Sequence, residues 1–170
     1  MPIVMVEKTY RAIRHEVVRK RQREDSADTR HPDEKINQIR LALNDSEDLN
    51  ILELFAGSGN LTKEYAKYGS VVAVDNVGKV YAQLVENMKD YDNVVCERKN
   101  SFYYFHELIS KKKKFNVVDL DPYGFPNRVF PDVYQLIEDG YLFVTVPKPY
   151  VNILNGISQA LLISYSGNHN

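Results

Sequence analysis

A short apolar run that breaks into a glycine-rich turn constrains the fold of this chain more than any other feature. Residues 51–55 are apolar except for Glu53, as in a strand that is covered on both faces. Gly57 and Gly59 let the backbone turn sharply and approach a ligand, because glycine has no Cβ. Asn60 stands where it can cap a following helix over about residues 60–68. This strand–turn–helix unit predicts a doubly wound α/β fold, which binds nucleotide-like ligands at such a turn.

Strand and helix patterns alternate from residue 50 onward. The predicted strands are residues 50–55, 70–75, 93–98, 115–121 and 141–146. Helical patterns lie between them, and the last, around residues 131–138, is expected to end at Gly140. Strands separated by helices at short intervals predict a parallel sheet with right-handed crossovers. For the chain after residue 147, the pattern allows either a sixth strand or a terminal helix.

The first 49 residues read as a helical extension, and residues 50–170 as the core. One helix is expected over residues 6–24. A second is expected from Pro32 to about Asn44, and its apolar positions are Ile36, Ile39, Leu41 and Leu43. The run of basic residues at 19–23 leaves two readings open, a phosphate contact or a solvated helix face. The lysines at 111–114 suit the negative end of a helix dipole better than a nucleic-acid patch.

Composition excludes several classes of protein. No run of about 18 apolar residues exists, so no membrane-spanning helix and no membrane partner are expected. The single cysteine, Cys96, excludes an internal disulfide and gives no metal cluster. A reducing cytoplasm is therefore the expected location.

Two polar residues follow the second and third predicted strands. Asp75 ends the second strand, where a carboxylate can accept hydrogen bonds from both hydroxyls of a ribose. The alternative is a turn aspartate, although ribose binding fits the neighbouring glycine turn better. Asn100 follows the third strand, where its amide could meet an adenine edge, or where Asn100 or Ser101 could simply cap a helix. Those two readings of Asn100 remain open.

The most informative stretch is Asp121-Pro122-Tyr123, at the end of the fourth predicted strand. Asp121 is expected at the carboxyl edge of the sheet, beside the nucleoside. Pro122 contributes a carbonyl but no N–H, and Tyr123 offers a ring on which a planar base can stack. These groups can accept the N–H bonds of an amine on an aromatic ring, so that its lone pair points at an electrophile.

Together these elements resemble the class I S-adenosylmethionine-dependent methyltransferases. Residues 52–59 are similar to the first motif of that family, and Asp75 to its ribose-binding acid. Residues 119–126 most resemble the tRNA guanine-N2 dimethyltransferases, although Phe125 stands where those enzymes have serine. The similarity covers roughly residues 50–147. It implies a Rossmann-like methyltransferase core, in which the sixth and seventh strands usual in the superfamily are not evident.

The resemblance also implies roles. Glu53, Phe55, Gly57, Gly59, Asp75 and Asn100 would bind S-adenosylmethionine, and Asp121, Pro122 and Tyr123 would hold the target amine and its base. The expected reaction is methylation of an exocyclic amino group of a nucleic-acid base, with tRNA guanine N2 preferred. DNA remains an alternative acceptor. A non-catalytic cofactor-binding subunit, with a protein partner that supplies target recognition, remains another. A nicotinamide-dependent oxidoreductase ranks below both, because Thr62 replaces the third glycine of the dinucleotide motif.

Overall fold

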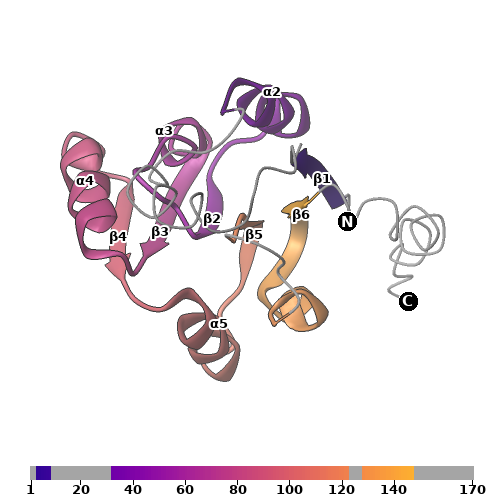
Figure 1. The fold of residues 1–170 in the computed structure, drawn as a ribbon. Helices are drawn as coiled ribbons and strands as arrows, with labels where there is room; N and C mark the ends of the chain where they lie inside the picture. The colour runs from indigo at the N-terminus through magenta and orange to yellow at the C-terminus, as the bar shows by residue number, and fades with distance from the viewer. Residues whose placement is uncertain (1–2, 9–31, 123–127, 148–170) are drawn as a thin grey trace, which may run out of the picture.

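A parallel sheet forms the centre of the molecule (Figure 1). The computed structural model of the 170-residue chain describes residues 3–8, 32–122 and 128–147. In these ranges the sheet has six strands in the order β1-β6-β5-β2-β3-β4, and every neighbouring pair is parallel. The strands are β1 (Ile3–Lys8), β2 (Leu49–Leu54), β3 (Gly69–Asp75), β4 (Val94–Arg98), β5 (Phe115–Leu120) and β6 (Ile137–Pro147).

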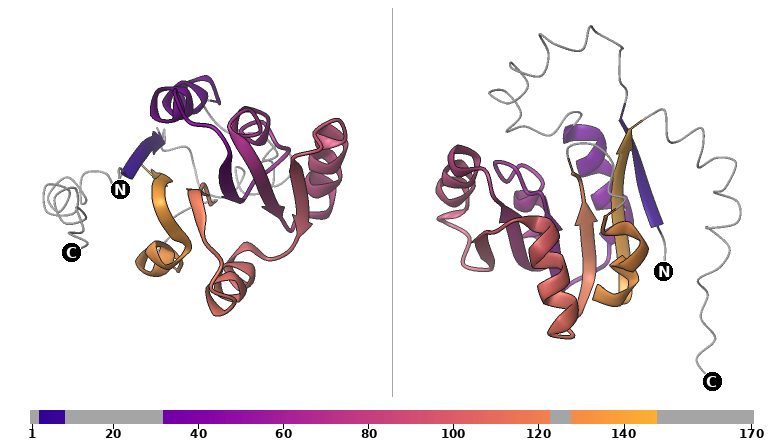
Figure 2. Two further views of the ribbon diagram at one scale, coloured as in Figure 1. Left: turned by 180° about the vertical axis from the view of Figure 1, so that it is seen from behind. Right: turned by 60° about the horizontal axis from the view of Figure 1, so that its bottom comes forward.

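Helices cover both faces of the sheet (Figure 2). One face carries α2 (Pro32–Leu43), α3 (Thr62–Tyr65) and α4 (Gly78–Met88), and the other carries α5 (Ser101–Ser110) and the 3-10 helix η1 (Phe130–Leu136). Each face has its own apolar core. Ile39, Tyr65 and Leu84 pack on one side, and Phe105 and Leu136 on the other. This three-layer arrangement explains why the central strands are apolar on both faces.

The central strands and helices agree with the sequence patterns. The strands predicted at 50–55, 70–75, 93–98 and 115–121 correspond to β2 to β5, and α2 begins at Pro32 as expected. The helix after the glycine turn is shorter than predicted, because α3 covers only residues 62–65 and its N-cap is Leu61 rather than Asn60. On α2, Ile39 and Leu43 are buried, but Leu41 is 82% exposed. The apolar stripe of that helix is therefore narrower than predicted.

The prediction that Gly140 ends a helix is wrong. The segment 130–136 is a 3-10 helix, and β6 starts directly after it, so Gly140 lies inside a strand. The pairing of β5 with β6 is irregular here: Phe115 pairs with Ile137, but Val117 pairs with Tyr141. A Cβ at position 140 would lie 1.7 Å from the carbonyl oxygen of Asn116. Glycine is thus required by close backbone contact in a β-bulge, not by a helix end.

The extreme N-terminal segment belongs to the sheet. Residues 3–8 form edge strand β1, which pairs with β6 from Ile3–Leu142 to Lys8–Pro147. A helix starting at residue 6 is therefore wrong for residues 6–8, and its remaining residues lie outside the described ranges. Residues 3–8 share the sheet of the core, and a domain boundary at residue 49 stays a prediction.

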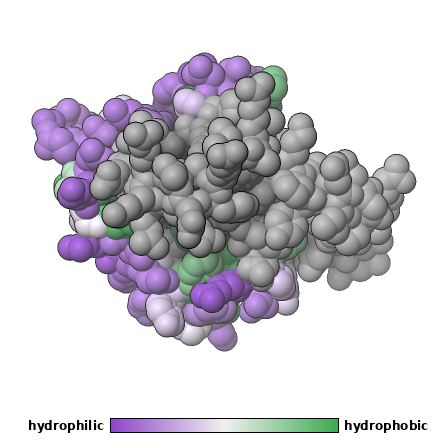
Figure 3. Space-filling model, viewed as in Figure 1, coloured by the Kyte–Doolittle hydropathy of each residue, from purple (hydrophilic) through white to green (hydrophobic). Residues whose placement is uncertain are grey.

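The surface over α2 and α4 is mainly hydrophilic (Figure 3). Among the described residues, no helix combines the length and apolar character needed to cross a membrane.

Candidate active site

Three loops meet at the carboxyl edge of the sheet. Leu54, the last residue of β2, pairs with Val74 on one side and with Leu120 on the other. The N–H groups of Phe55 and Ala56 then donate to the carbonyl oxygen of Val74, at 3.0 and 2.9 Å. The turn after β2 is thereby held beside the ends of β3 and β5.

The turn itself has the geometry that its glycines predict. Gly57 and Gly59 have φ angles of 60° and 91°, which glycine adopts without strain. Phe55 also has a positive φ, 76°, which is uncommon for a residue with a Cβ. Its ring packs edge-to-face on Phe102, with 5.4 Å between the ring centroids. Backbone strain at such a turn is characteristic of ligand-binding loops.

Asp75 is bonded into this turn. One carboxylate oxygen accepts the Gly57 N–H at 3.1 Å, and the other accepts the Val77 N–H at 2.8 Å. Burial raises the pKa of the carboxyl group, and these backbone N–H bonds oppose the rise. The structure thus gives Asp75 the turn role weighed as the alternative. Each carboxylate oxygen has two acceptor sites, so a ribose contact is compatible with this geometry and stays a prediction.

Asn100 caps α5. Its side-chain oxygen accepts the N–H groups of Phe102 and Tyr103, at 3.1 and 3.3 Å. Of the two readings left open by the sequence, the helix cap is the one that the structure shows. A contact of the remaining amide group with adenine stays a prediction.

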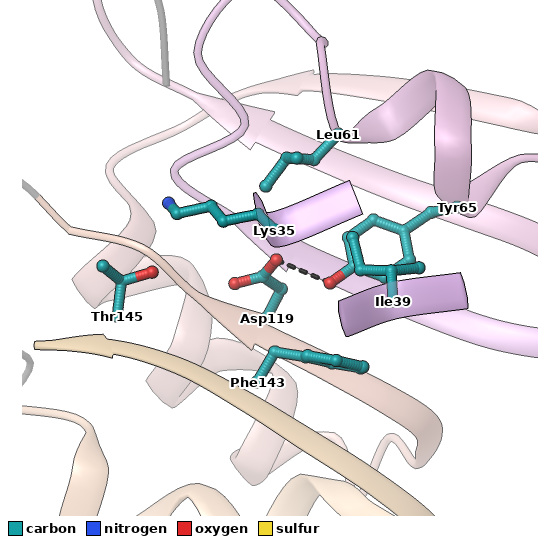
Figure 4. A pocket seen from close by; sticks show the side chains of 7 residues that line it. All are labelled: Lys35, Ile39, Leu61, Tyr65, Asp119, Phe143 and Thr145. Carbon is teal, nitrogen blue, oxygen red and sulfur yellow. Dashed lines mark hydrogen bonds between the residues drawn. The ribbon is translucent and has the colours of Figure 1, made fainter. Parts of the chain in front are cut away.

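Two carboxyl groups lie side by side under the turn. Glu53 on β2 pairs in register with Asp119 on β5, and the two residues are 3% and 4% exposed. The Thr62 hydroxyl donates to Glu53 at 2.5 Å. The Tyr65 hydroxyl donates to Asp119 at 2.6 Å (Figure 4). Burial and the neighbouring Asp119 raise the pKa of Glu53 well above its usual value. A protonated Glu53, or a nearby cation, is therefore favoured.

Such a cation comes from α2. The buried Lys35 ammonium, whose side chain is 3% exposed, donates to Asp121 at the end of β5. Asp121 and Pro122 thus lie at the predicted edge of the sheet, whereas Tyr123 is outside the described residues. Lys35 and Asp119 also line a pocket with Ile39, Leu61, Tyr65, Phe143 and Thr145 (Figure 4).

Sequence reasoning missed three polar members of this site: Lys35, Thr62 and Tyr65. Thr62 was noted only as a missing glycine, and its bond to Glu53 explains why a hydroxyl is useful there. Tyr65 lies in the helix predicted over residues 60–68, and its place there gives no sign of a carboxylate partner on β5. Lys35 is 86 residues from Asp121 in the chain, and no local pattern marks the contact.

Comparison with known proteins decides the family. The family model for N2,N2-dimethylguanosine tRNA methyltransferase matches residues 4–153. The chain belongs to this family. A curated relative, tRNA (guanine(26)-N(2))-dimethyltransferase 2 of Arabidopsis thaliana, is 26% identical over 74% of the chain and 22% of its own length. The Caenorhabditis elegans tRNA (guanine(26)-N(2))-dimethyltransferase is 30% identical over 62% of the chain and 22% of its own length. The family member described here thus spans about a fifth of each of these relatives.

Solved structures confirm the fold class. The precorrin 8w decarboxylase of Methanobacterium thermoautotrophicum has a TM-score of 0.60 at 14% identity and covers 80% of this chain and 75% of its own. Aeropyrum pernix fibrillarin, solved with natively bound S-adenosyl-L-methionine, has a TM-score of 0.51 at 16% identity and covers 58% of this chain and 46% of its own. The predicted Rossmann-like fold of the core is confirmed.

The donor groups at this edge suit the cofactor of the family. Asp75 offers carboxylate oxygens beside the turn. The clustered carboxyl groups of Glu53, Asp119 and Asp121 repel one another, so a cationic ligand beside them is favoured. The positive φ angles of Gly57 and Gly59 give the close backbone approach that such a ligand needs. S-adenosylmethionine, with its ribose and its positively charged sulfur, has this combination of groups.

Proposed function

We propose that this chain binds S-adenosylmethionine and methylates the exocyclic amino group of a guanine in RNA, with tRNA guanine N2 as the first candidate. The observation that supports this most directly is the position of Asp121-Pro122 at the end of β5, next to the glycine turn that follows β2. The family membership points to the same acceptor.

The bound cofactor would supply an electrophilic methyl group. The residues of the chain would then act by position and charge. Asp121 and the Pro122 carbonyl would accept the N–H bonds of the target amine and aim its lone pair. Asp75 would hold the ribose, and Asn100 would face the adenine. Glu53, with Phe55, Gly57 and Gly59, would bind the methionine end, and Tyr123 would stack on the base. A base within a duplex would have to be flipped out.

The test has two stages. Calorimetry first measures S-adenosylmethionine binding to the folded chain, and absence of binding would contradict the proposal. Incubation with methyl-labelled cofactor then compares separate pools of tRNA, rRNA, DNA and protein. Label in tRNA, lost in Asp121→Ala while cofactor binding persists, is the expected result. Asp92→Ala is the matched control, because Asp92 is exposed and lies in the loop before β4.

A second candidate function is a subunit that binds the cofactor without transferring its methyl group. The chain spans 22% of the length of the Arabidopsis relative. In this alternative, the cofactor-binding subunit needs a protein partner for target recognition. Cofactor binding without transfer to any pool, and transfer restored by a co-purified partner, would favour it. Label that appears only in DNA would favour a DNA amino-methyltransferase. The proposed location is the cytoplasm, as for a chain with one free cysteine.

A further inference from the structure

A buried lysine sits among the carboxyl groups of the proposed active site. Lys35 is 3% exposed, and its ammonium contacts Asp121 directly. Glu53 and Asp119, both almost fully buried, are neighbours in register on the adjoining strands. The charges of Asp119, Asp121 and Lys35 all act on Glu53, with Lys35 opposing the two carboxylates. We call Glu53, Asp119 and Asp121 the carboxyl cluster.

Burial of an ammonium is costly unless a negative partner compensates it. Lys35 meets that requirement by its contact with Asp121, and it lowers the mutual repulsion of the carboxyl cluster. The contact nevertheless competes with function, because the proposed reaction uses Asp121 to accept N–H bonds from the target amine. The Lys35 ammonium must therefore leave Asp121 when the target amine binds, or the two donors must share the carboxylate.

The helix that carries Lys35 has other anchors, so it would stay docked if the Lys35 side chain moved. The Arg40 guanidinium, one and a half turns further along α2, makes two hydrogen bonds to Glu64 next to the end of α3, at 2.9 and 3.0 Å. Ile39 and Leu43 fix the same helix in the core. Lys35 lies in the first turn of α2, and its four-carbon stem can swing while these anchors remain. In Figure 4 the stem of Lys35 lies along the pocket, between Leu61 and Asp119.

We propose that Lys35 is an exchangeable counter-ion of the carboxyl cluster, which holds Asp121 in the ligand-free protein and leaves it when a ligand brings its own positive charge. This inference rests on the proposed function, since the ligand in question is the cationic cofactor. S-adenosylmethionine carries a positive sulfur, and its demethylated form, S-adenosylhomocysteine, carries a neutral one. Lys35 therefore makes the site respond differently to the two forms: it is displaced by the first and stays with the second.

The first experiment uses the unmodified chain. The protein is acetylated with an N-hydroxysuccinimide ester in three states: without ligand, with S-adenosylhomocysteine, and with sinefungin. In sinefungin a carbon that carries an amine replaces the methylated sulfur. Mass spectrometry then gives the acetylation of each lysine. We expect Lys35 to be protected from acetylation in the ligand-free protein and in the presence of S-adenosylhomocysteine. With the cationic sinefungin, it should react several-fold more. Lys89, which follows α4 directly and is 58% exposed in an ion pair with Glu86, should react equally in all three states.

The second experiment uses binding. In Lys35→Met, the carboxyl cluster lacks its internal cation, so affinity for S-adenosylmethionine relative to S-adenosylhomocysteine should rise by about tenfold, the size of one charge interaction at such range. Lys35→Arg keeps the charge, so the ratio of the two affinities should stay at the wild-type value. The control Lys89→Met should also leave this ratio unchanged. Calorimetry measures both affinities.

The outcomes separate this inference from the function on which it rests. If neither form of the cofactor binds, the proposed function and the inference about Lys35 are both overturned. If the cofactor binds but Lys35 stays protected with sinefungin, or Lys35→Met weakens both forms equally, Lys35 is a fixed structural partner of Asp121 and only this inference is overturned. The labelling arm gives that answer even if Lys35→Met fails to fold.

Discussion

The Tyr65 hydroxyl on α3 donates a 2.6 Å hydrogen bond to Asp119 on β5, and both side chains are buried. The bond joins a helix to the sheet beneath it, 54 residues apart in the chain. Burial and the nearby carboxylates raise the pKa of Tyr65 well above its usual value, so the hydroxyl keeps its proton and remains a donor. Asp119 is thereby fixed next to Glu53, within the carboxyl cluster.

Removal of the Tyr65 hydroxyl should destabilise the fold. In Tyr65→Phe the ring remains packed against Phe143, but the buried Asp119 loses a donor. We expect the free energy of unfolding to fall by about 1–3 kcal/mol, the typical cost of such a loss. Urea denaturation measures it. Tyr103→Phe is the matched control, since Tyr103 is 80% exposed, and an equal loss in both variants would contradict the assignment.

Glu53 should make the stability of the ligand-free protein depend on pH. Its pKa in the folded chain lies well above 4.5, so the folded state keeps a proton that the unfolded state releases. The free energy of unfolding must therefore fall as pH rises above that unfolded value. Glu53→Gln keeps an acceptor for Thr62 but cannot ionise.

Urea denaturation from about pH 5 to about pH 8 tests this linkage. The wild type should lose stability relative to Glu53→Gln as pH rises. Parallel curves for the two proteins would show that the Glu53 carboxyl does not titrate differently on unfolding.

Asp75 should contribute to cofactor affinity. In Asp75→Ala, the N–H groups of Gly57 and Val77 lose their acceptor, and the proposed ribose contact disappears. We expect the affinity for S-adenosylmethionine to fall by at least about tenfold, as for the loss of one or two charge-assisted hydrogen bonds. Calorimetry on Asp75→Ala and on the exposed control Asp92→Ala checks it. Unchanged affinity in a folded Asp75→Ala protein would remove Asp75 from the cofactor site.

Gly140 should tolerate no side chain. A Cβ there would lie 1.7 Å from the carbonyl oxygen of Asn116, so β5 and β6 would have to separate. We expect Gly140→Ala to lower the free energy of unfolding by more than about 3 kcal/mol, beyond the usual range for a point change. At Gly78 the nearest atom to a new Cβ is the flexible Arg98 guanidinium, at 3.1 Å.

Gly78→Ala is thus the matched control, and it should change stability little or raise it, because alanine favours the helix. Thermal or urea unfolding of both variants gives the comparison. A mild effect at position 140 would mean that the bulge relaxes easily.

Much of the fold could be read from local patterns. The apolar runs of β2 to β5 and the helical spacing of α2, α4 and α5 are short-range signals. The four strands fall within about two residues of their predicted bounds. The positive φ angles of Gly57 and Gly59, and the place of Asp121 after β5, follow from the same patterns. The patterns failed where long-range contact overrides local preference, as at β1, which pairs with the distant β6.

Gly140 shows the same limit. A glycine after a helical pattern has two possible causes, a helix end or a close backbone contact, and only the position of Asn116 distinguishes them. Asn100 and Asp75 are similar cases, because a polar residue at a strand end can serve the backbone, a ligand or both. The structure shows their backbone bonds.

The sequence by itself determined the parallel α/β core, the glycine turn after β2 and the resemblance that the family match confirms, because these depend on residues close together in the chain. Only the tertiary structure decided that Lys35 reaches Asp121, that Glu53 lies beside Asp119 and that Tyr65 bonds to it. Strand order and helix docking bring those side chains together from distant segments. No local spacing encodes such contacts, and the charge balance of the site depends on them.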